Sequence, residues 1–242
     1  MKSPWIDDFL KQQDVIPVAK TIYLTACLEP LSITELCRIS SMSRGRVRYH
    51  LQALARQGWI VLRKEGRRVL VLPTAPDVVQ VKHAKILKAM VSMALFRGEA
   101  QMKVLLDVLV VSRYFVENAR PDFLRSPVTG LNLEVDRLYP DVAGFEYEGA
   151  QHSRPTAKFG GKPKYDNTRV NDLIKAGMTV EANIQLVRVV KADLTVEGMQ
   201  RLIPASMKTW PLVEGPYLQA IRETCAEYMQ MDTGEEDQRE SQ

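Results

Sequence analysis

The alternation of apolar and polar positions predicts a helical first third of the chain. Apolar residues recur there at helical spacing and predict three helices, over residues 15–28, 33–39 and 44–57. Ser32 stands three residues before Glu35, the spacing of a capping box, which places the start of the second helix. Two apolar runs around a Lys-Glu-Gly tip then predict a β-hairpin over 60–73.

The pattern after residue 74 predicts helices alternating with strands. Pro76 opens a helix, and its apolar residues would pack in a core or against a second copy of the chain: Val78, Val81, Ile86, Met90, Met93 and Ala94. Further elements are predicted, with helices over 99–118, 166–176 and 194–202 and strands over 178–182 and 185–190. Asp166 would cap its helix and Gly177 would end it. This region is therefore expected to form a mixed α/β layer.

Residues 131–152 combine strand periodicity with an unusual number of acids. They predict a hairpin that turns at Pro140-Asp141, with Leu131, Leu133 and Val135 on one face. Four acids line the two strands, namely Glu134, Asp136, Glu146 and Glu148. Neighbouring like charges on a sheet destabilise it by up to ~1 kcal/mol per pair, so a cation or a shared proton is expected there. Mg²⁺ binds carboxylates in this way.

Composition places the chain among globular proteins. Its 242 residues are 45% hydrophobic and 26% charged, which allows one large domain or two small ones. No apolar run is long enough for a bilayer, and acids stand in the N-terminal stretch where a signal peptide is apolar. The three cysteines are odd in number and lack metal-ligand spacing. We therefore expect a cytoplasmic protein with no membrane partner.

Charge is unevenly distributed along the chain. Residues 1–73 carry 12 Lys and Arg against 6 Asp and Glu, whereas residues 232–242 carry one Arg against five acids. A basic N-terminal region favours nucleic acid as a partner. The acidic end has no apolar residue to bury and is predicted to be a disordered tail, which a partner protein could bind.

Three helices followed by a basic hairpin resemble the winged helix-turn-helix of many bacterial regulators, over about 60 residues. The resemblance rests on the stretch RVRYHLQALARQGWIVLRKEGRR and implies that the third helix enters the major groove of double-stranded DNA. Eight residues would contact DNA, from the helix and then the wing: Arg44, Arg46, Arg48, Gln52, Arg63, Lys64, Arg67 and Arg68. His50 is expected near the exposed helix residues and is given no base-reading role. The alternatives are a solvated basic face on a small helical domain and a winged helix used for protein contact.

About 95 residues of the C-terminal region resemble the nuclease domains related to very-short-patch repair endonucleases, within the restriction-endonuclease-like fold (the PD-(D/E)xK superfamily). That family has a Glu on a first helix, a strand ending in Asp, an acid-x-acid-Gly-x-x-His segment and an Asp opening the next helix. The matching positions are Glu99, Asp136, Glu146 to His152, and Asp166. The wider fold usually has Lys where this chain has Glu148.

The resemblance implies Mg²⁺- or Mn²⁺-dependent hydrolysis of phosphodiester bonds. Asp136 and Glu148, with Glu146 or Glu99, would bind the ion, which neutralises phosphate charge and acidifies a water. His152 would transfer a proton and Asp166 would orient it or a metal-bound water. A polar loop over 153–165, expected to be mobile, would hold the DNA backbone with Arg154, Lys158, Lys162 and Lys164.

Ordinary structural roles also account for several of these residues. Asp166 is explained as a helix cap, His152 as a solvated side chain, and Glu134 and Glu146 as surface acids. The fold class expected is α+β, with four segments: a winged helix over 1–73, a connector helix over 74–98, a nuclease domain over 99–210 and a closing helix with tail over 211–242. The function expected is a DNA endonuclease. The alternatives are a DNA-binding regulator with an inactive nuclease-like domain and a subunit of a larger DNA-processing complex.

Overall fold

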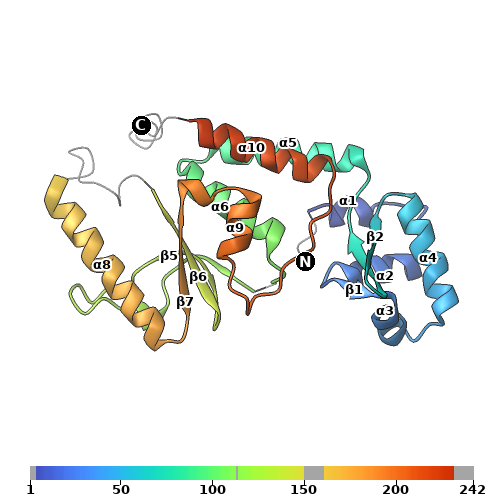
Figure 1. The fold of residues 1–242 in the computed structure, drawn as a ribbon, viewed down its shortest axis with the longest axis horizontal. Helices are drawn as coiled ribbons and strands as arrows, with labels where there is room; N and C mark the ends of the chain where they lie inside the picture. Colours follow the sequence, from blue (N-terminus) through green and yellow to red (C-terminus); the bar gives the residue numbers. More distant parts are fainter. Residues whose placement is uncertain (1–3, 113, 150–160, 232–242) are drawn as a thin grey trace. The chain divides into compact units, whose positions relative to one another are not determined.

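The structure is a computed structural model that describes residues 4–112, 114–149 and 161–231. Its fold is mixed α and β, as expected, and its contacts divide the chain into two compact units. The N-terminal unit comprises Met1–Ala89 and Thr209–Ile221, and the C-terminal unit comprises Met90–Lys208 and Arg222–Gln242. The long connector helix thus belongs partly to each unit, and the chain returns to the N-terminal unit near its end (Figure 1).

The N-terminal unit is a helical domain with a three-stranded antiparallel sheet. Its elements are α1 (Ile6–Leu10), α2 (Pro17–Ala26), β1 (Leu31–Ser32), α3 (Ile33–Ser40), α4 (Arg44–Arg56), β2 (Ile60–Glu65), β3 (Arg68–Pro73) and most of α5 (Asp77–Met93). The sheet order is β1-β3-β2, and Glu65 pairs with Arg68, so the hairpin turns at Gly66-Arg67 instead of the expected Lys64-Glu65-Gly66. The three predicted helices and the hairpin are confirmed within two or three residues.

Sequence signals set the ends of the helices. Ser32 caps α3, because its hydroxyl accepts from the Glu35 amide (3.3 Å) while the Glu35 carboxylate accepts from the Ser32 amide (2.7 Å). The predicted capping box is therefore confirmed. Ser43 caps α4 by accepting from the Arg46 amide at 3.4 Å. Pro17 opens α2, where its lack of an amide hydrogen has no consequence.

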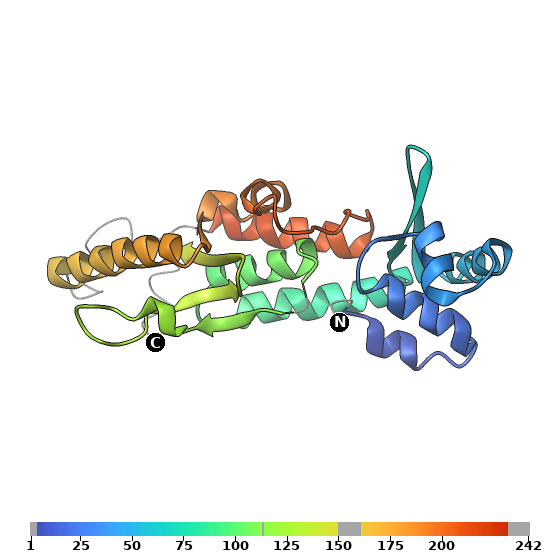
Figure 2. The same cartoon turned by 90° about the horizontal axis from the view of Figure 1, so that it is seen from below.

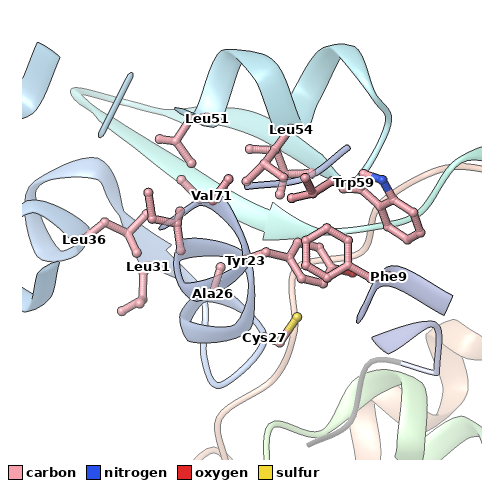
Figure 3. Packing of buried hydrophobic residues seen from close by; sticks show 14 of the residues in the cluster. Phe9, Tyr23, Ala26, Cys27, Leu31, Leu36, Leu51, Leu54, Trp59 and Val71 are labelled. Atoms are coloured by element: carbon pink, nitrogen blue, oxygen red, sulfur yellow. The ribbon is translucent and has the colours of Figure 1, made fainter. Parts of the chain in front are cut away.

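Aromatic residues form the centre of the N-terminal core (Figure 3). The Phe9 ring lies 3.9 Å from the Tyr23 ring and 4.9 Å from the Trp59 ring, measured between centroids. The Tyr23 hydroxyl donates to the Thr74 carbonyl at 2.8 Å, which satisfies its polar end inside the core. Phe9 comes from α1, a short helix that the sequence pattern did not predict.

The returning segment 209–221 packs against the same unit. The Tyr217 ring meets the Trp5 ring edge-on at 5.1 Å, and the Tyr217 amide donates to the Gln80 side chain at 3.3 Å. The Leu212 carbonyl accepts from the Arg63 guanidinium at 3.1 Å. Residues near the end of the chain therefore complete a domain that begins at its start.

The C-terminal unit is a four-stranded sheet between helices. Its elements are α6 (Arg97–Leu109), β4 (Val116–Ala119), η1 (Asp122–Leu124), β5 (Val135–Tyr139), β6 (Ala143–Glu148), α8 (Gly161–Glu181), β7 (Gln185–Val190), η3 (Lys191–Asp193), α9 (Val196–Leu202) and the later part of α10 (Pro216–Gln230). The strand order is β4-β5-β6-β7. The first three strands are antiparallel, and β6 pairs with β7 in parallel. In Figure 1, α8 lies on one side of the sheet and α6 and α9 lie on the other.

Several predicted elements in this unit are corrected. The helix expected over 99–118 ends at Leu109, before the β-branched pair Val110-Val111, and Val116–Ala119 is a strand. The strand expected over 178–182 is the last part of α8, which starts at Gly161 and passes through both Asp166 and Gly177. Asp166 is thus inside a helix instead of capping one, and the loop expected over 153–165 is helical from Gly161 onwards.

The connector helix α5 differs from its expected environment. Its apolar residues are largely exposed, with exposed fractions of 76% for Val78, 59% for Met90 and 85% for Met93. The interpretation as a core-packing stripe is therefore wrong for these residues. The buried apolar residues of α5 are Ala84 and Val91, which the predicted stripe did not include. On its polar side, the Asp8 carboxylate accepts from Lys82 at 3.1 Å and lies 2.9 Å from the His83 imidazole.

Candidate nucleic-acid interface and acidic centre

Helix α4 presents basic residues to solvent. Val47, His50, Leu51 and Leu54 are its buried residues, whereas Arg44, Arg46, Arg48 and Gln52 are all exposed, as predicted. His50 is 5% exposed, so its expected position near the exposed residues is wrong. The buried set recurs at intervals of three and four, which fixes one face of the helix against the core and leaves the opposite face free.

The wing carries a second set of cations. Arg63, Lys64, Arg67 and Arg68 are exposed on the hairpin β2–β3, which projects from the helices of the unit (teal in Figure 2). Arg63 also lies 3.6 Å from the Glu65 carboxylate and donates to the Leu212 carbonyl. A projecting basic hairpin beside an exposed basic helix is an arrangement suited to phosphate and groove contacts.

In the C-terminal unit, the hairpin β5–β6 positions three of the predicted acids. Arg137 pairs with Phe145, so Asp136 and Glu146 lie opposite one another near the start of β5, and Glu148 follows at the end of β6. Residues two apart on a strand share a face, which puts these three acids on one face of the sheet. The strand ends are corrected: β5 starts at Val135, so Leu131, Leu133 and Glu134 precede it, and Asp136 is the second residue of the strand instead of its last.

Asp136 has a raised pKa. Burial raises its pKa, the Tyr147 amide opposes the shift by donating to Oδ2 at 2.8 Å, and the charges of Glu99 and Glu146 raise it further, to about 6. Among the described residues, Asp136 makes no salt bridge. We call Asp136, Glu99 and Glu146 the acidic centre.

Basic side chains accompany the other acids. Lys103 pairs with Glu99 and with Glu117 (3.1 Å), Lys175 of α8 pairs with Glu146, and Arg188 of β7 pairs with Glu148 at 3.1 Å. Burial favours the neutral amine of Lys103, but its bonds to Glu99 and Glu117 hold its pKa above the ordinary value. The sequence predicted a positive charge among these acids. Lys103, Lys175 and Arg188 supply part of it, and the pattern of the hairpin alone did not indicate them.

Arg137 forms a separate buried ion network. Its side chain is 3% exposed and donates to Asp107 (2.8 Å), to Glu117 and to the Lys103 carbonyl (3.1 Å). The guanidinium also lies 4.4 Å from the centre of the Phe115 ring. This network joins α6 to β4 and β5 on the sheet face opposite Asp136.

Tyr147 fixes how closely α6 approaches the sheet. A side chain at Gly98 would run into the Tyr147 ring, so only glycine allows this approach at the start of α6. The Tyr147 hydroxyl lies 2.6 Å from the Tyr228 hydroxyl of α10. The first turn of α6 carries Glu99, so this packing sets the position of one member of the acidic centre.

The remaining predicted residues lie beyond what the structure describes. His152, Arg154 and Lys158 fall outside the described residues, as does the predicted acidic tail 232–242. Asp166, Lys162 and Lys164 are placed on α8 by their backbone alone. Within the described part of the chain, no three His, Cys, Asp or Glu side chains are grouped closely enough to share a metal ion. No helix in the described ranges has the length and apolarity needed to cross a membrane.

Comparison with known protein families identifies the segment of the N-terminal unit that contains α4. Residues 22–63 match the IclR helix-turn-helix domain. This segment is therefore an IclR-type helix-turn-helix DNA-binding domain, and it covers α3 and α4, which carry the exposed arginines. The prediction of a helix-turn-helix is confirmed, its winged form is supported by the hairpin, and double-stranded DNA is the partner that such a domain indicates.

Two viral proteins resemble parts of the chain. The uncharacterized protein 033L of Invertebrate iridescent virus 3 is 36% identical over 95 residues, which are 38% of this chain and 48% of the viral protein. The uncharacterized protein 307L of Invertebrate iridescent virus 6 is 38% identical over 78 residues, or 29% and 40% of the two chains. The chain thus spans less than half the length of either relative. No solved structure matches it.

Proposed function

We propose that this protein is a DNA endonuclease in which the helix-turn-helix binds duplex DNA and the C-terminal unit hydrolyses a phosphodiester bond with Mg²⁺ or Mn²⁺. The observation that carries the proposal is Asp136, a carboxylate that burial and two neighbouring acids make costly to ionise. Strand interiors disfavour such a residue. A role that requires a charged, partly dehydrated carboxylate accounts for it.

The order of elements supports the same proposal. Glu99 stands on a helix, three antiparallel strands follow with Asp136 and Glu146 on the second and third, and then come a helix and a parallel strand. This is the order in which the acids occur in the very-short-patch repair nucleases that the sequence resembles. Of the polar residues of that resemblance, Glu99 stands on α6, Asp136, Glu146 and Glu148 stand on the hairpin β5–β6, and Asp166 falls on α8.

A hard divalent cation fits the acidic centre by donor type. Asp136 would hold it with Glu146 or Glu99, and Glu148 is the further carboxylate implied by the resemblance. When bound, the ion would neutralise charge on the scissile phosphate and acidify a water. Lys103 and Lys175 would keep Glu99 and Glu146 in place and add positive charge beside the phosphate. His152 would transfer the proton, oriented by Asp166.

The test is cleavage of supercoiled and linear DNA by the full chain with Mg²⁺, Mn²⁺ or EDTA. The decisive variant is Asp136→Asn, and Glu134→Gln is its matched control, because Glu134 pairs with Arg120 at 2.7 Å outside the acidic centre. We expect the wild type and Glu134→Gln to cut with metal, and Asp136→Asn and all EDTA samples not to cut. Cutting by Asp136→Asn at the wild-type rate would contradict the assignment of this residue.

A DNA-binding regulator is the second candidate. Two observations favour it: the match of residues 22–63 to an IclR helix-turn-helix, and the pairing of Glu99, Glu146 and Glu148 with basic side chains. In that case the C-terminal unit would serve assembly or ligand sensing. Sequence-specific binding that is unchanged by EDTA, together with no cleavage under any metal condition, would establish this candidate over the nuclease.

A further inference from the structure

Helix α4 has two opposite faces with the same residue spacing. The buried residues Val47, His50, Leu51 and Leu54 follow the spacing i, i+3, i+4, i+7. A shift of two residues turns an α-helix by about 200°. The residues two positions earlier therefore form the opposite face, and we call them the outward stripe: Gly45, Arg48, Tyr49 and Gln52. All four are exposed.

Gly45 has no structural reason to be glycine within the described chain. No atom lies within 4 Å of the place where its β-carbon would stand, and its φ is outside the left-handed region that favours glycine. Glycine in the middle of a helix is less favourable than alanine by about 0.5–1 kcal/mol, and Gly45, the second residue of α4, carries a smaller cost of the same sign. The absence of a side chain at this position allows another molecule to approach the backbone of the helix closely.

Tyr49 is the large side chain of the stripe. It is 67% exposed, and its ring meets the buried His50 ring edge-on at 5.4 Å. Apart from this contact the ring lies largely in water, where it offers an apolar surface with a polar tip to a partner. Arg48 and Gln52 are its neighbours on the stripe, and both can form paired hydrogen bonds with base edges.

We propose that the outward stripe is the base-reading surface of this protein, with Gly45 at the closest approach to DNA and Arg48, Tyr49 and Gln52 as its specificity-determining residues. The inference rests on DNA binding by the helix-turn-helix. Arg44 and Arg46 lie about 100° to either side of Gly45 on the helix, so they contact the phosphates that border the groove. This divides the four predicted helix residues into two kinds.

The chemistry of the stripe indicates what it reads. With a rise of 1.5 Å per residue, Gly45 to Gln52 extends about 10.5 Å along the helix, which corresponds to roughly three base pairs at 3.4 Å each. Arg48 suits the O6 and N7 acceptors of guanine, and Gln52 suits N6 and N7 of adenine. The Tyr49 ring suits a thymine methyl group. The ligand is therefore a duplex with a short mixed-sequence core.

The test selects binding sites from a random duplex library with the full chain in EDTA, and then measures affinity at several salt concentrations. Alanine at Arg48, Tyr49 or Gln52 is expected to weaken binding to the selected site by roughly 5- to 150-fold, to relax the preference at one position, and to leave non-specific binding nearly unchanged. Alanine at Arg44 or Arg46 is expected to weaken binding to all sequences and to lower the salt slope by about 1.

Gly45→Ala gives a second, independent readout because its two effects have opposite signs. The substitution should raise the melting temperature of the N-terminal unit and reduce affinity for the selected site at least roughly tenfold. Thr21→Ala, at an exposed position on α2, is the control and should leave affinity unchanged. If Gly45→Ala and Tyr49→Ala select the same site as the wild type and bind it with the same affinity, the base-reading role of the outward stripe is wrong, although DNA binding by the helix-turn-helix is not contradicted. No duplex binding by the wild type would overturn both.

Discussion

The backbone amide of Tyr147 donates a hydrogen bond of 2.8 Å to Oδ2 of Asp136. This bond connects the β6 backbone to a side chain of β5, and together with the charge of Lys103 it favours the charged form of Asp136. It does not balance burial and the charges of Glu99 and Glu146, and the pKa of Asp136 therefore rises to about 6. At neutral pH the charged Asp136 side chain therefore makes the fold less stable than a neutral side chain of the same size would.

Replacing Asp136 with Asn is expected to stabilise the protein at neutral pH. The pKa of Asp136 is about 6 in the folded state against an ordinary value of 3.8, so the folded state binds the proton more tightly. The free energy of unfolding therefore falls by about 3 kcal/mol as the pH rises from about 4 to about 6. Asp136→Asn keeps an oxygen for the Tyr147 amide and should gain about 1–3 kcal/mol at pH 7.5 and little at pH 4.

Circular dichroism or calorimetry during unfolding measures this gain. Tryptophan fluorescence does not serve, because Trp5, Trp59 and Trp210 all belong to the N-terminal unit. Glu134→Gln is the control and should change little at either pH. A stabilisation that is equal at pH 4 and pH 7.5 would show that ionisation of Asp136 is not its source.

Divalent cations are expected to stabilise the C-terminal unit through Asp136. A ligand at 100 times its dissociation constant adds about 2.7 kcal/mol to the stability of the state that binds it. Thermal unfolding of the wild type should shift upward with Mg²⁺ or Mn²⁺ at pH 7.5, and less at pH 5, where Asp136 is largely protonated. An identical shift in Asp136→Asn would place the ion elsewhere. This measurement is independent of cleavage.

Two arginines in this region are expected to differ sharply in their contribution to stability. Arg137 is buried among Asp107, Glu117 and Phe115, and Arg137→Met would leave Glu117 without a close partner besides Lys103. The two acids are 52% and 40% exposed and can regain water, so Arg137→Met should destabilise by about 1.5–3 kcal/mol, the range of hydrogen bonds to charged groups. Arg120 pairs with Glu134 while its side chain is 62% exposed, and Arg120→Met should change stability by at most about 1 kcal/mol. Equal effects in urea unfolding would refute the distinction.

The exposed apolar residues of α5 predict self-association. Val78 and Met93 are 76% and 85% exposed, and a homodimer would bury them. Sedimentation velocity is expected to show a dimer of the wild type that Val78→Glu and Met93→Glu weaken. Lys85→Glu, a charge change at an exposed position of the same helix, is the control. A monomeric wild type at micromolar concentration would end this prediction.

The sequence predicted local structure well where one element determines it. The capping box at Ser32, the three N-terminal helices and the turn of the acidic hairpin follow from spacings within a few residues. Prediction from the sequence failed where a weak local signal, such as a glycine, did not determine where an element ends. Gly177 marks a helix end in the sequence, but a glycine in a helix is unfavourable by only about 1 kcal/mol, and α8 continues through it to Glu181.

The acidic centre shows a second limit of the sequence. The pattern placed Asp136 and Glu146 on neighbouring strands, which is correct. It could not show that Lys175, 29 residues after Glu146, would pair with it, because that contact depends on how α8 lies on the sheet. Nor could it show that the apolar residues of α5 are exposed, since helical periodicity indicates a face and not what covers it.

The return of residues 209–221 to the N-terminal unit decides how the protein can be divided. A fragment that stops after the connector helix would contain the whole DNA-binding motif but would lose Tyr217 from beside Trp5 and the carbonyl of Leu212 from Arg63. The polypeptide also passes between the units three times, after residues 89, 208 and 221, so a single protease cut in the first passage leaves residues 1–89 held to the rest of the chain only by their packing against residues 209–221. A free-standing DNA-binding fragment therefore requires the distant segment to be attached by a short artificial linker.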